Sequence, residues 1–186
     1  MLPNKKLKAI IIDHNDSFTE NVRAWLQPDF EVTVIHFENI SNVQPANYDL
    51  IIISPGPKSP QDYPETIDFL KSLADSKPVL GICLGMQMMY HLTGSSIKSY
   101  APPIHGKATK LICEIPDFNQ TSIARYHSLR VPDIHSEFNV LGTSDGIPMW
   151  AQHPTKKWMG FQFHPESFLT EKSVEFKNFI KGWICE

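Results

Sequence analysis

Four short apolar runs in the first half of the chain restrict the fold more than any other feature of the sequence. They cover residues 7–12, 32–37, 50–54 and 79–83. The segments 17–26 and 64–74, which lie between these runs, have the pattern of amphipathic helices. Because strands that alternate with helices are joined by right-handed crossovers, the pattern predicts a parallel sheet. Ser17 and Glu20 have the spacing of a capping box, which places the start of the first helix at Ser17.

Shorter β-like runs follow Gly94. They cover residues 108–115, 122–130, 140–143, 149–152 and 159–164, and a last helix is predicted over 173–183. The predicted architecture is an α/β fold of the flavodoxin-like type, with an open, mainly parallel sheet, helices on both faces and additional antiparallel strands in the second half. No low-complexity stretch divides the 186 residues, so we predict one domain over residues 1–186.

The composition argues against several classes of protein. The formal net charge of −3 gives no electrostatic basis for binding nucleic acid. No stretch approaches the roughly 18 uninterrupted apolar residues of a membrane helix, and the apolar run near the start is too short for a signal peptide. We therefore expect a cytoplasmic protein with no membrane partner. The eight histidines are scattered without close ligand pairs, so we expect no metal site and no cofactor in this chain.

Cys83 lies where a predicted strand passes directly into a helix predicted over residues 84–92. The segment GICLGMQ (residues 81–87) sets it between two glycines, which is the pattern of a nucleophile elbow with a thiol. A cysteine at a helix N-terminus is exposed to the positive end of the helix dipole, which favours the thiolate. The alternative is an inert buried cysteine, the commoner case for a cysteine that follows an apolar strand.

His164 and Glu166 are the best candidates for the partners of such a thiolate. Pro165 favours an extended backbone at His164, so His164 and Glu166 share one face of the segment GFQFHPES (160–167). Glu166 can then accept the imidazole N–H and fix the tautomer. Strand alternation places Gln162 on the side of His164 and the two phenylalanines on the other side. The alternative is a surface turn with an incidental ion pair.

A proline-braced loop, SPGPKSP (54–60), ends another predicted strand. Gly56 is a backbone donor between two prolines and has no side chain to obstruct it, so its N–H can form half of an oxyanion hole. The N–H of Leu84, directly after Cys83, would form the other half. An ordinary turn is the alternative. The segment RYHSL (125–129) has polar groups, including Ser128, that could hold the ends of a small substrate.

Six segments together resemble a known family. They are DHNDSF (13–18), SPGP (54–57), GICLGMQ (81–87), HGK (105–107), RYHSL (125–129) and GFQFHPES (160–167). In this order they resemble the class I, or triad, glutamine amidotransferases. RYHSL and HPESFLTE resemble in particular component II of anthranilate synthase or of aminodeoxychorismate synthase. The resemblance extends from Asp13 to Glu171 and so covers nearly the whole chain.

The resemblance implies an activity, a partner and a role for each matched residue. The activity is hydrolysis of L-glutamine through a thioester, with the ammonia passed to a chorismate-binding synthase subunit, component I, that uses Mg²⁺. The implied catalytic residues are Cys83 as nucleophile, His164 as general base and acid, and Glu166 as its orienting group. Gly56 and Leu84 are implied as the oxyanion donors, and the glutamine-binding residues as Gly56, Lys58, Gln87, Ser128 and Leu129.

The sequence departs from the usual family pattern at a few places. Lys58 stands where many relatives have glycine, and Met86 where many have histidine. Residues 13–16 read DHND in place of the more usual DNYD. The departures at Lys58 and Met86 do not affect the expected catalysis, but they weaken the assignment to the chorismate branch, so an amidotransferase subunit of another pathway, such as GMP synthesis, is one alternative. A non-catalytic interaction module that keeps the fold is a second alternative, and the intact Cys83, His164 and Glu166 argue against it.

Overall fold

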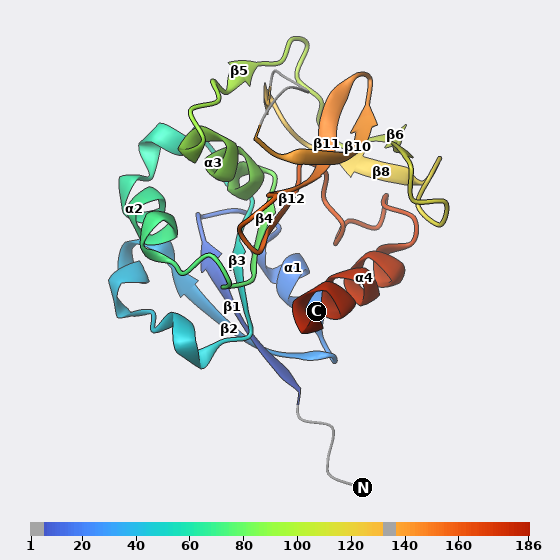
Figure 1. Ribbon diagram of the computed structural model, residues 1–186. Helices are drawn as coiled ribbons and strands as arrows, with labels where there is room; N and C mark the ends of the chain where they lie inside the picture. Colours follow the sequence, from blue (N-terminus) through green and yellow to red (C-terminus); the bar gives the residue numbers. More distant parts are fainter. Residues whose placement is uncertain (1–5, 132–136) are drawn as a thin grey trace, which may run out of the picture.

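The computed structural model describes residues 6–131 and 137–186, and its centre is an eight-stranded sheet (Figure 1). The strand order is β2-β1-β3-β4-β12-β11-β10-β7. The strands are β1 (Leu7–Asp13), β2 (Phe30–His36), β3 (Leu50–Ile53), β4 (Val79–Ile82), β7 (Ile112–Cys113), β10 (Asn139–Ser144), β11 (Ile147–Gln152) and β12 (Trp158–Phe161). Two small two-stranded sheets, β5 (Lys98–Ser99) with β9 (Leu129–Arg130) and β6 (Lys107–Lys110) with β8 (Ser122–Arg125), lie outside it.

The sheet is parallel in one half and antiparallel in the other. The pairs β1/β2, β1/β3, β3/β4 and β4/β12 are parallel, whereas β12, β11, β10 and β7 pair in antiparallel fashion. This arrangement confirms the predicted flavodoxin-like sheet with additional antiparallel strands. β12 is the junction, because it pairs in parallel with β4 on one side and in antiparallel fashion with β11 on the other.

Helices cover both faces of the parallel strands, as predicted (Figure 1). α1 (Thr19–Leu26) and α4 (Ser173–Cys185) pack on one face, where Ala9 and Ile11 of β1 join their apolar side chains in one core cluster. α2 (Pro64–Ser72) and α3 (Leu84–Leu92) pack on the other face against Ile10 and Ile12. Alternate residues of β1 thus point into two cores, which explains its unbroken apolar run. None of the helices described is long and apolar enough to cross a membrane.

The structure corrects the predicted start of the first helix. α1 begins at Thr19, its N-cap position is Phe18, and no side chain caps it, so the Ser17–Glu20 capping box was a wrong prediction. The carboxylates of Asp13 and Asp16 organise this turn instead. Thr19 Oγ1 donates to Asp13 Oδ1 at 2.7 Å, and the Phe18 N–H donates to Asp16 Oδ1 at 2.8 Å.

Three predicted strands in the second half are shorter than expected. The run 108–115 is divided between β6 and β7, and the run 122–130 is divided between β8 and β9. The run 159–164 ends as a strand at Phe161, and residues 162–164 leave the sheet. Apolar alternation continues through these breaks, so periodicity alone did not reveal them. The 3-10 turns at Phe37–Asn42, Pro45–Asn47 and Pro60–Asp62, and strand β5, were not predicted.

Candidate active site

Cys83 stands at the sharp turn between β4 and α3, as the sequence predicted. Its backbone angles, φ 51° and ψ −101°, lie in a region that side-chain-bearing residues rarely occupy. The two flanking glycines make the turn possible. A Cβ on Gly81 would lie 2.5 Å from the carbonyl carbon of Gly85, and a Cβ on Gly85 would collide with the carbonyl oxygen of Ile53. The close approach of α3 to β3 and β4 therefore depends on glycine at both positions.

Gly85→Ala is expected to lower the free energy of unfolding by about 3 kcal/mol or more, because the new methyl group meets rigid backbone of β3. Gly182→Ala in α4 is the matched control. A Cβ there meets nothing within 4 Å, so this change is expected to raise stability by about 0.5–1 kcal/mol. Urea denaturation of both variants tests the prediction. Equal small effects at the two positions would show that the turn does not require Gly85.

His164 and Glu166 form a buried pair beyond the end of β12. His164 Nδ1 lies 2.7 Å from Glu166 Oε1, and the two side chains are 2% and 0% exposed. Burial by itself lowers the pKa of His164, but the Glu166 carboxylate and the Cys83 thiol oppose this effect and raise that pKa well above its ordinary value. Within the described part of the chain, Nε2 of His164 has no hydrogen-bond partner. This nitrogen is thus free for a proton transfer.

The segment that carries His164 is held in place by several contacts. The His164 N–H donates to the Ala124 carbonyl of β8 at 3.0 Å, and Thr170 Oγ1 donates to the His164 carbonyl at 2.6 Å. The imidazole lies between two aromatic rings, with ring centres 4.9 Å from Phe18 and 5.0 Å from Tyr126. These contacts leave the imidazole little freedom to rotate, which suits a group that must keep one orientation.

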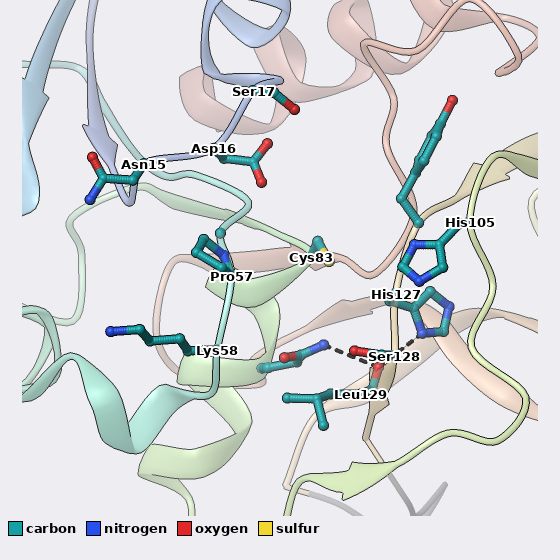
Figure 2. A pocket seen from close by; sticks show the side chains of 13 residues that line it. Asn15, Asp16, Ser17, Pro57, Lys58, Cys83, His105, His127, Ser128 and Leu129 are labelled. Atoms are coloured by element: carbon teal, nitrogen blue, oxygen red, sulfur yellow. Dashed lines mark hydrogen bonds between the residues drawn. The ribbon is translucent and has the colours of Figure 1, made fainter.

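A pocket of about 380 Å³ opens at the carboxyl ends of the parallel strands (Figure 2). Its lining combines the loops after β1 and β3, Cys83 with Gln87 of α3, the segment that leads into β9, and His105 before β6. The lining residues are Asn15, Asp16, Ser17, Gly56, Pro57, Lys58, Cys83, Gln87, His105, Tyr126, His127, Ser128 and Leu129. The volume is adequate for a molecule the size of an amino acid. The thiol of Cys83 borders this space.

The predicted glutamine-binding residues Gly56, Lys58, Gln87, Ser128 and Leu129 all border the pocket. Lys58 contributes mainly through its backbone, because its exposed side chain extends away from Cys83 in Figure 2. Its φ of 67° is left-handed, a conformation that suits glycine. Ser128 is exposed, whereas the amide of Gln87 is buried and donates to the Leu129 carbonyl at 3.2 Å.

Gly56, which borders the pocket, lies against the side chain of Leu84. A Cβ on Gly56 would lie 2.6 Å from Leu84 Cδ2 and 2.8 Å from His14 Cβ, so only glycine fits there. Among residues 6–131 and 137–186, no hydrogen-bond acceptor faces the backbone N–H of either residue. The N–H of Cys83, in contrast, donates to the Phe161 carbonyl at 2.6 Å. The N–H groups of Gly56 and Leu84 are thus unused donors in the described part of the chain, and Leu84 directly follows Cys83.

Several polar residues at the site had no role assigned from the sequence. Gln162 is fully buried, and its Nε2 lies 3.5 Å from the sulfur of Cys83. The only signal for it was the strand alternation that set it on the side of His164. Asp16 borders the pocket, and burial raises its pKa. His127 is held between Arg125 and the Leu129 carbonyl, and burial together with Arg125 lowers its pKa to about 4.

His14, the unusual residue of the first motif, is a buried neutral imidazole. Ser54 Oγ donates to the Pro55 carbonyl at 2.6 Å, so the His14 Nδ1–H donates to Ser54 Oγ at 3.1 Å. Nε2 then accepts from Thr66 Oγ1 at 2.9 Å. Burial lowers the pKa of His14 to about 4. The imidazole therefore braces the loop that carries Gly56.

Acid is expected to destabilise the protein through His14. Its pKa is about 4 in the folded state and near 6.5 unfolded, so the unfolded chain takes up the proton first as the pH falls. Stability contributed by the neutral ring is complete above pH 6.5 and is lost towards pH 4. The free energy of unfolding should therefore fall less between pH 7 and pH 4.5 in His14→Asn than in the wild type, by about 2 kcal/mol. Urea denaturation of both proteins at the two pH values measures this difference. The same pH dependence of stability in the variant and the wild type would contradict the prediction.

The site has the features of an enzyme with a cysteine nucleophile. The thiol stands at a strained strand-to-helix turn, a histidine–carboxylate pair is buried nearby, and a pocket opens at the strand ends. The family described as glutamine amidotransferase class-I matches residues 10–182, and the chain belongs to this family. Among curated proteins, it is 36% identical over 183 residues to anthranilate synthase component 2 of Halobacterium salinarum, which covers 88% of this chain and 91% of the relative. It is 34% identical over 201 residues to the protein of the same name from Leptospira biflexa, with 95% and 100% covered.

Solved structures show the same fold at lower sequence identity. A Thermoplasma acidophilum protein proposed to be part of a GMP synthase superimposes with a TM-score of 0.82 at 20% identity, covering 97% of this chain and 95% of that chain. A glutamine amidotransferase from Thermotoga maritima gives a TM-score of 0.69 at 16% identity, with the same coverage. The predicted family and enzyme class are confirmed by the sequence matches, and the fold class by these structures.

Proposed function

We propose that this chain hydrolyses L-glutamine with Cys83 as nucleophile and delivers the ammonia to a synthase subunit that aminates chorismate. The observation that carries the proposal is the position of Cys83. It borders a pocket of amino-acid size, and its thiol is one of the groups that raise the pKa of His164 in the buried His164–Glu166 pair. A buried histidine–carboxylate pair has a clear use beside a thiol, because the imidazole can take its proton and the carboxylate stabilises the imidazolium.

The reaction divides into two steps. The Cys83 thiolate attacks the side-chain amide carbon of glutamine, and the developing oxyanion accepts hydrogen bonds from the N–H groups of Gly56 and Leu84. The imidazolium of His164 gives its proton to the nitrogen, the C–N bond breaks, and ammonia leaves a thioester on Cys83. His164 then removes a proton from water, which attacks the thioester and releases glutamate with the thiol restored. Gln87, Ser128, Leu129 and the backbone at Lys58 would hold the ends of the substrate.

The curated relatives favour the chorismate branch. Both relatives described above are named anthranilate synthase component 2, and each aligns over most of its own length. The likeness to the Thermoplasma acidophilum protein, at 20% identity, shows a shared fold alone. We therefore propose component I, the chorismate-binding subunit, as partner, with anthranilate as the favoured product and 4-amino-4-deoxychorismate as the other product that the same glutaminase chemistry can serve.

One glutaminase domain spans residues 1–186, and none of the chemistry above needs a cofactor in this chain, whereas the Mg²⁺ expected for the synthase belongs to the partner. A cytoplasmic location suits the chemistry, because a reducing compartment keeps the thiol of Cys83 free. Neither nucleic acid nor a membrane has a part in this function.

Reconstitution tests the partner. The purified chain is mixed with a chorismate-binding component I, Mg²⁺ and chorismate, with glutamine as the only nitrogen source, and the aminated product is identified by mass spectrometry. We expect an aminated product together with stoichiometric glutamate. If component I aminates chorismate with added ammonia but not with glutamine and this chain, the proposed partnership is wrong.

A separate measurement tests whether the chain is catalytic at all. An electrophilic glutamine analogue should label Cys83 in the complex and leave the exposed Cys185 unmodified. Absence of label on Cys83 would favour the alternative, a non-catalytic interaction module with this fold.

A further inference from the structure

A chain of side-chain amides connects the wall of the pocket with the sulfur of Cys83. Gln87 Nε2 donates to the Leu129 carbonyl at 3.2 Å and to Gln162 Oε1 at 3.1 Å. Gln162 Nε2 in turn lies 3.5 Å from Cys83 Sγ. The Leu129 carbonyl at the end of this chain also accepts a hydrogen bond from His127 Nδ1 at 2.9 Å (Figure 2).

The orientation of both amides follows from the hydrogen-bonding groups around them. The Leu129 carbonyl can only accept, so the amide of Gln87 must turn its NH₂ group towards it. The second hydrogen of that NH₂ group then faces Gln162, which must present its oxygen. The NH₂ group of Gln162 is thereby directed at the sulfur.

Burial makes this contact matter for the chemistry. Gln162 is 0% exposed and Gln87 is 3% exposed, so water does not compete for these amides. A neutral thiol is a weak hydrogen-bond acceptor, whereas a thiolate carries a full charge, and an N–H directed at it stabilises the charged form. The backbone N–H of Cys83 cannot serve in this way, because it is bonded to the Phe161 carbonyl.

We propose that Gln162 is a further catalytic residue, whose side-chain amide donates a hydrogen bond to the sulfur of Cys83 and stabilises the thiolate. Gln87 is a positioning residue for this donor, in addition to its place in the wall of the pocket. The inference rests on the proposed function, in which Cys83 is the nucleophile. It also explains why a polar side chain occupies a fully buried position directly after β12.

The test measures how readily Cys83 reacts with iodoacetamide as a function of pH, followed for the Cys83 peptide by mass spectrometry. Two variants remove the donor: Gln162→Met, which is similar in size and apolar, and Gln162→Glu, which keeps an oxygen for Gln87. In both, the midpoint of the labelling profile should move by about one to two units to higher pH, and kcat should fall by about ten- to a hundredfold at pH 7. The shift should be larger in Gln162→Glu, because its carboxylate repels the thiolate.

Two controls make the result specific. Gln152→Met removes a partly exposed amide at the end of β11 and should leave the Cys83 profile unchanged, and Cys185 in each variant is an internal reference for reagent and pH. Circular dichroism shows whether each variant is folded. If Gln162→Met does not fold, Gln162→Glu alone tests whether Gln162 donates to the sulfur of Cys83. An unchanged Cys83 profile in a folded Gln162 variant would overturn the donor role. A shifted profile without glutamine hydrolysis in the wild type would keep the donor role and reject the proposed substrate.

Discussion

Cys83→Ala is expected to abolish glutamate release, with kcat lowered by about 10⁴- to 10⁶-fold, because no other group at the site can form the thioester. The change should leave the fold intact. Alanine keeps the Cβ and the backbone strain of the turn, and only a sulfur of a 7% exposed side chain is lost. Glutamate release with the purified chain in the presence of its partner measures the effect.

Two further measurements test whether Cys83→Ala loses glutamate release because the nucleophile is missing and not because the fold is disturbed. The variant should still bind component I and permit amination of chorismate with added ammonia. Cys185→Ala, which removes an exposed thiol at the end of α4, should release glutamate at the wild-type rate. If Cys83→Ala kept more than about one tenth of the wild-type rate of glutamate release, Cys83 would lose its proposed role. The loss of rate would then be orders of magnitude smaller than the loss expected when a nucleophile is removed.

Glu166→Gln is expected to lower kcat by about 10³- to 10⁴-fold, a loss of the size known for the orienting carboxylate of a serine-protease triad. The amide keeps the shape of the side chain, but it cannot stabilise the imidazolium that forms on His164. The pKa of His164, which Glu166 holds well above its ordinary value, should fall, because burial then acts without the opposing carboxylate. Steady-state glutamate release and an NMR titration of His164 measure the two effects.

The same variant should change how stability depends on pH. A raised pKa of His164 in the folded state contributes stability that is fully present below pH 6.5 and is lost as the pH rises through the folded-state value. Glu166→Gln should lose this contribution at neutral and mildly acidic pH. Glu20→Gln removes a carboxylate that is 70% exposed on α1 and is the control for charge alone. Equal activities of Glu166→Gln and Glu20→Gln would contradict an orienting role for Glu166.

The sequence predicted the parallel half of the sheet and the position of the nucleophile turn with few errors. The runs that became β1, β2, β3 and β4 were recognised because each is short, apolar and bounded by turn-forming or charged residues. Helix α3, Leu84–Leu92, agreed with the prediction at both ends, because the glycines around Cys83 and the glycine after the helix mark its limits. The second half was predicted less well. Its strands are shorter than the apolar runs: β12, for example, ends at Phe161, and the N–H of His164 bonds to Ala124 of β8 and not to β11.

The local sequence determined which reactive side chains are present and which near neighbours pair with each other. The tertiary structure determined the contacts between side chains that are distant in the sequence. Residues 164–166 are close in the chain, so an extended backbone was enough to predict that His164 and Glu166 would pair. The contact between Gln162 and Cys83 joins residues 79 apart, and no periodicity or spacing encodes it. It exists because β4 and β12 pair in parallel, with Ile82 opposite Phe161, so that the residues following both strands meet at one edge of the sheet. Strand pairing over such distances depends on the packing of the two cores, which only the folded chain decides.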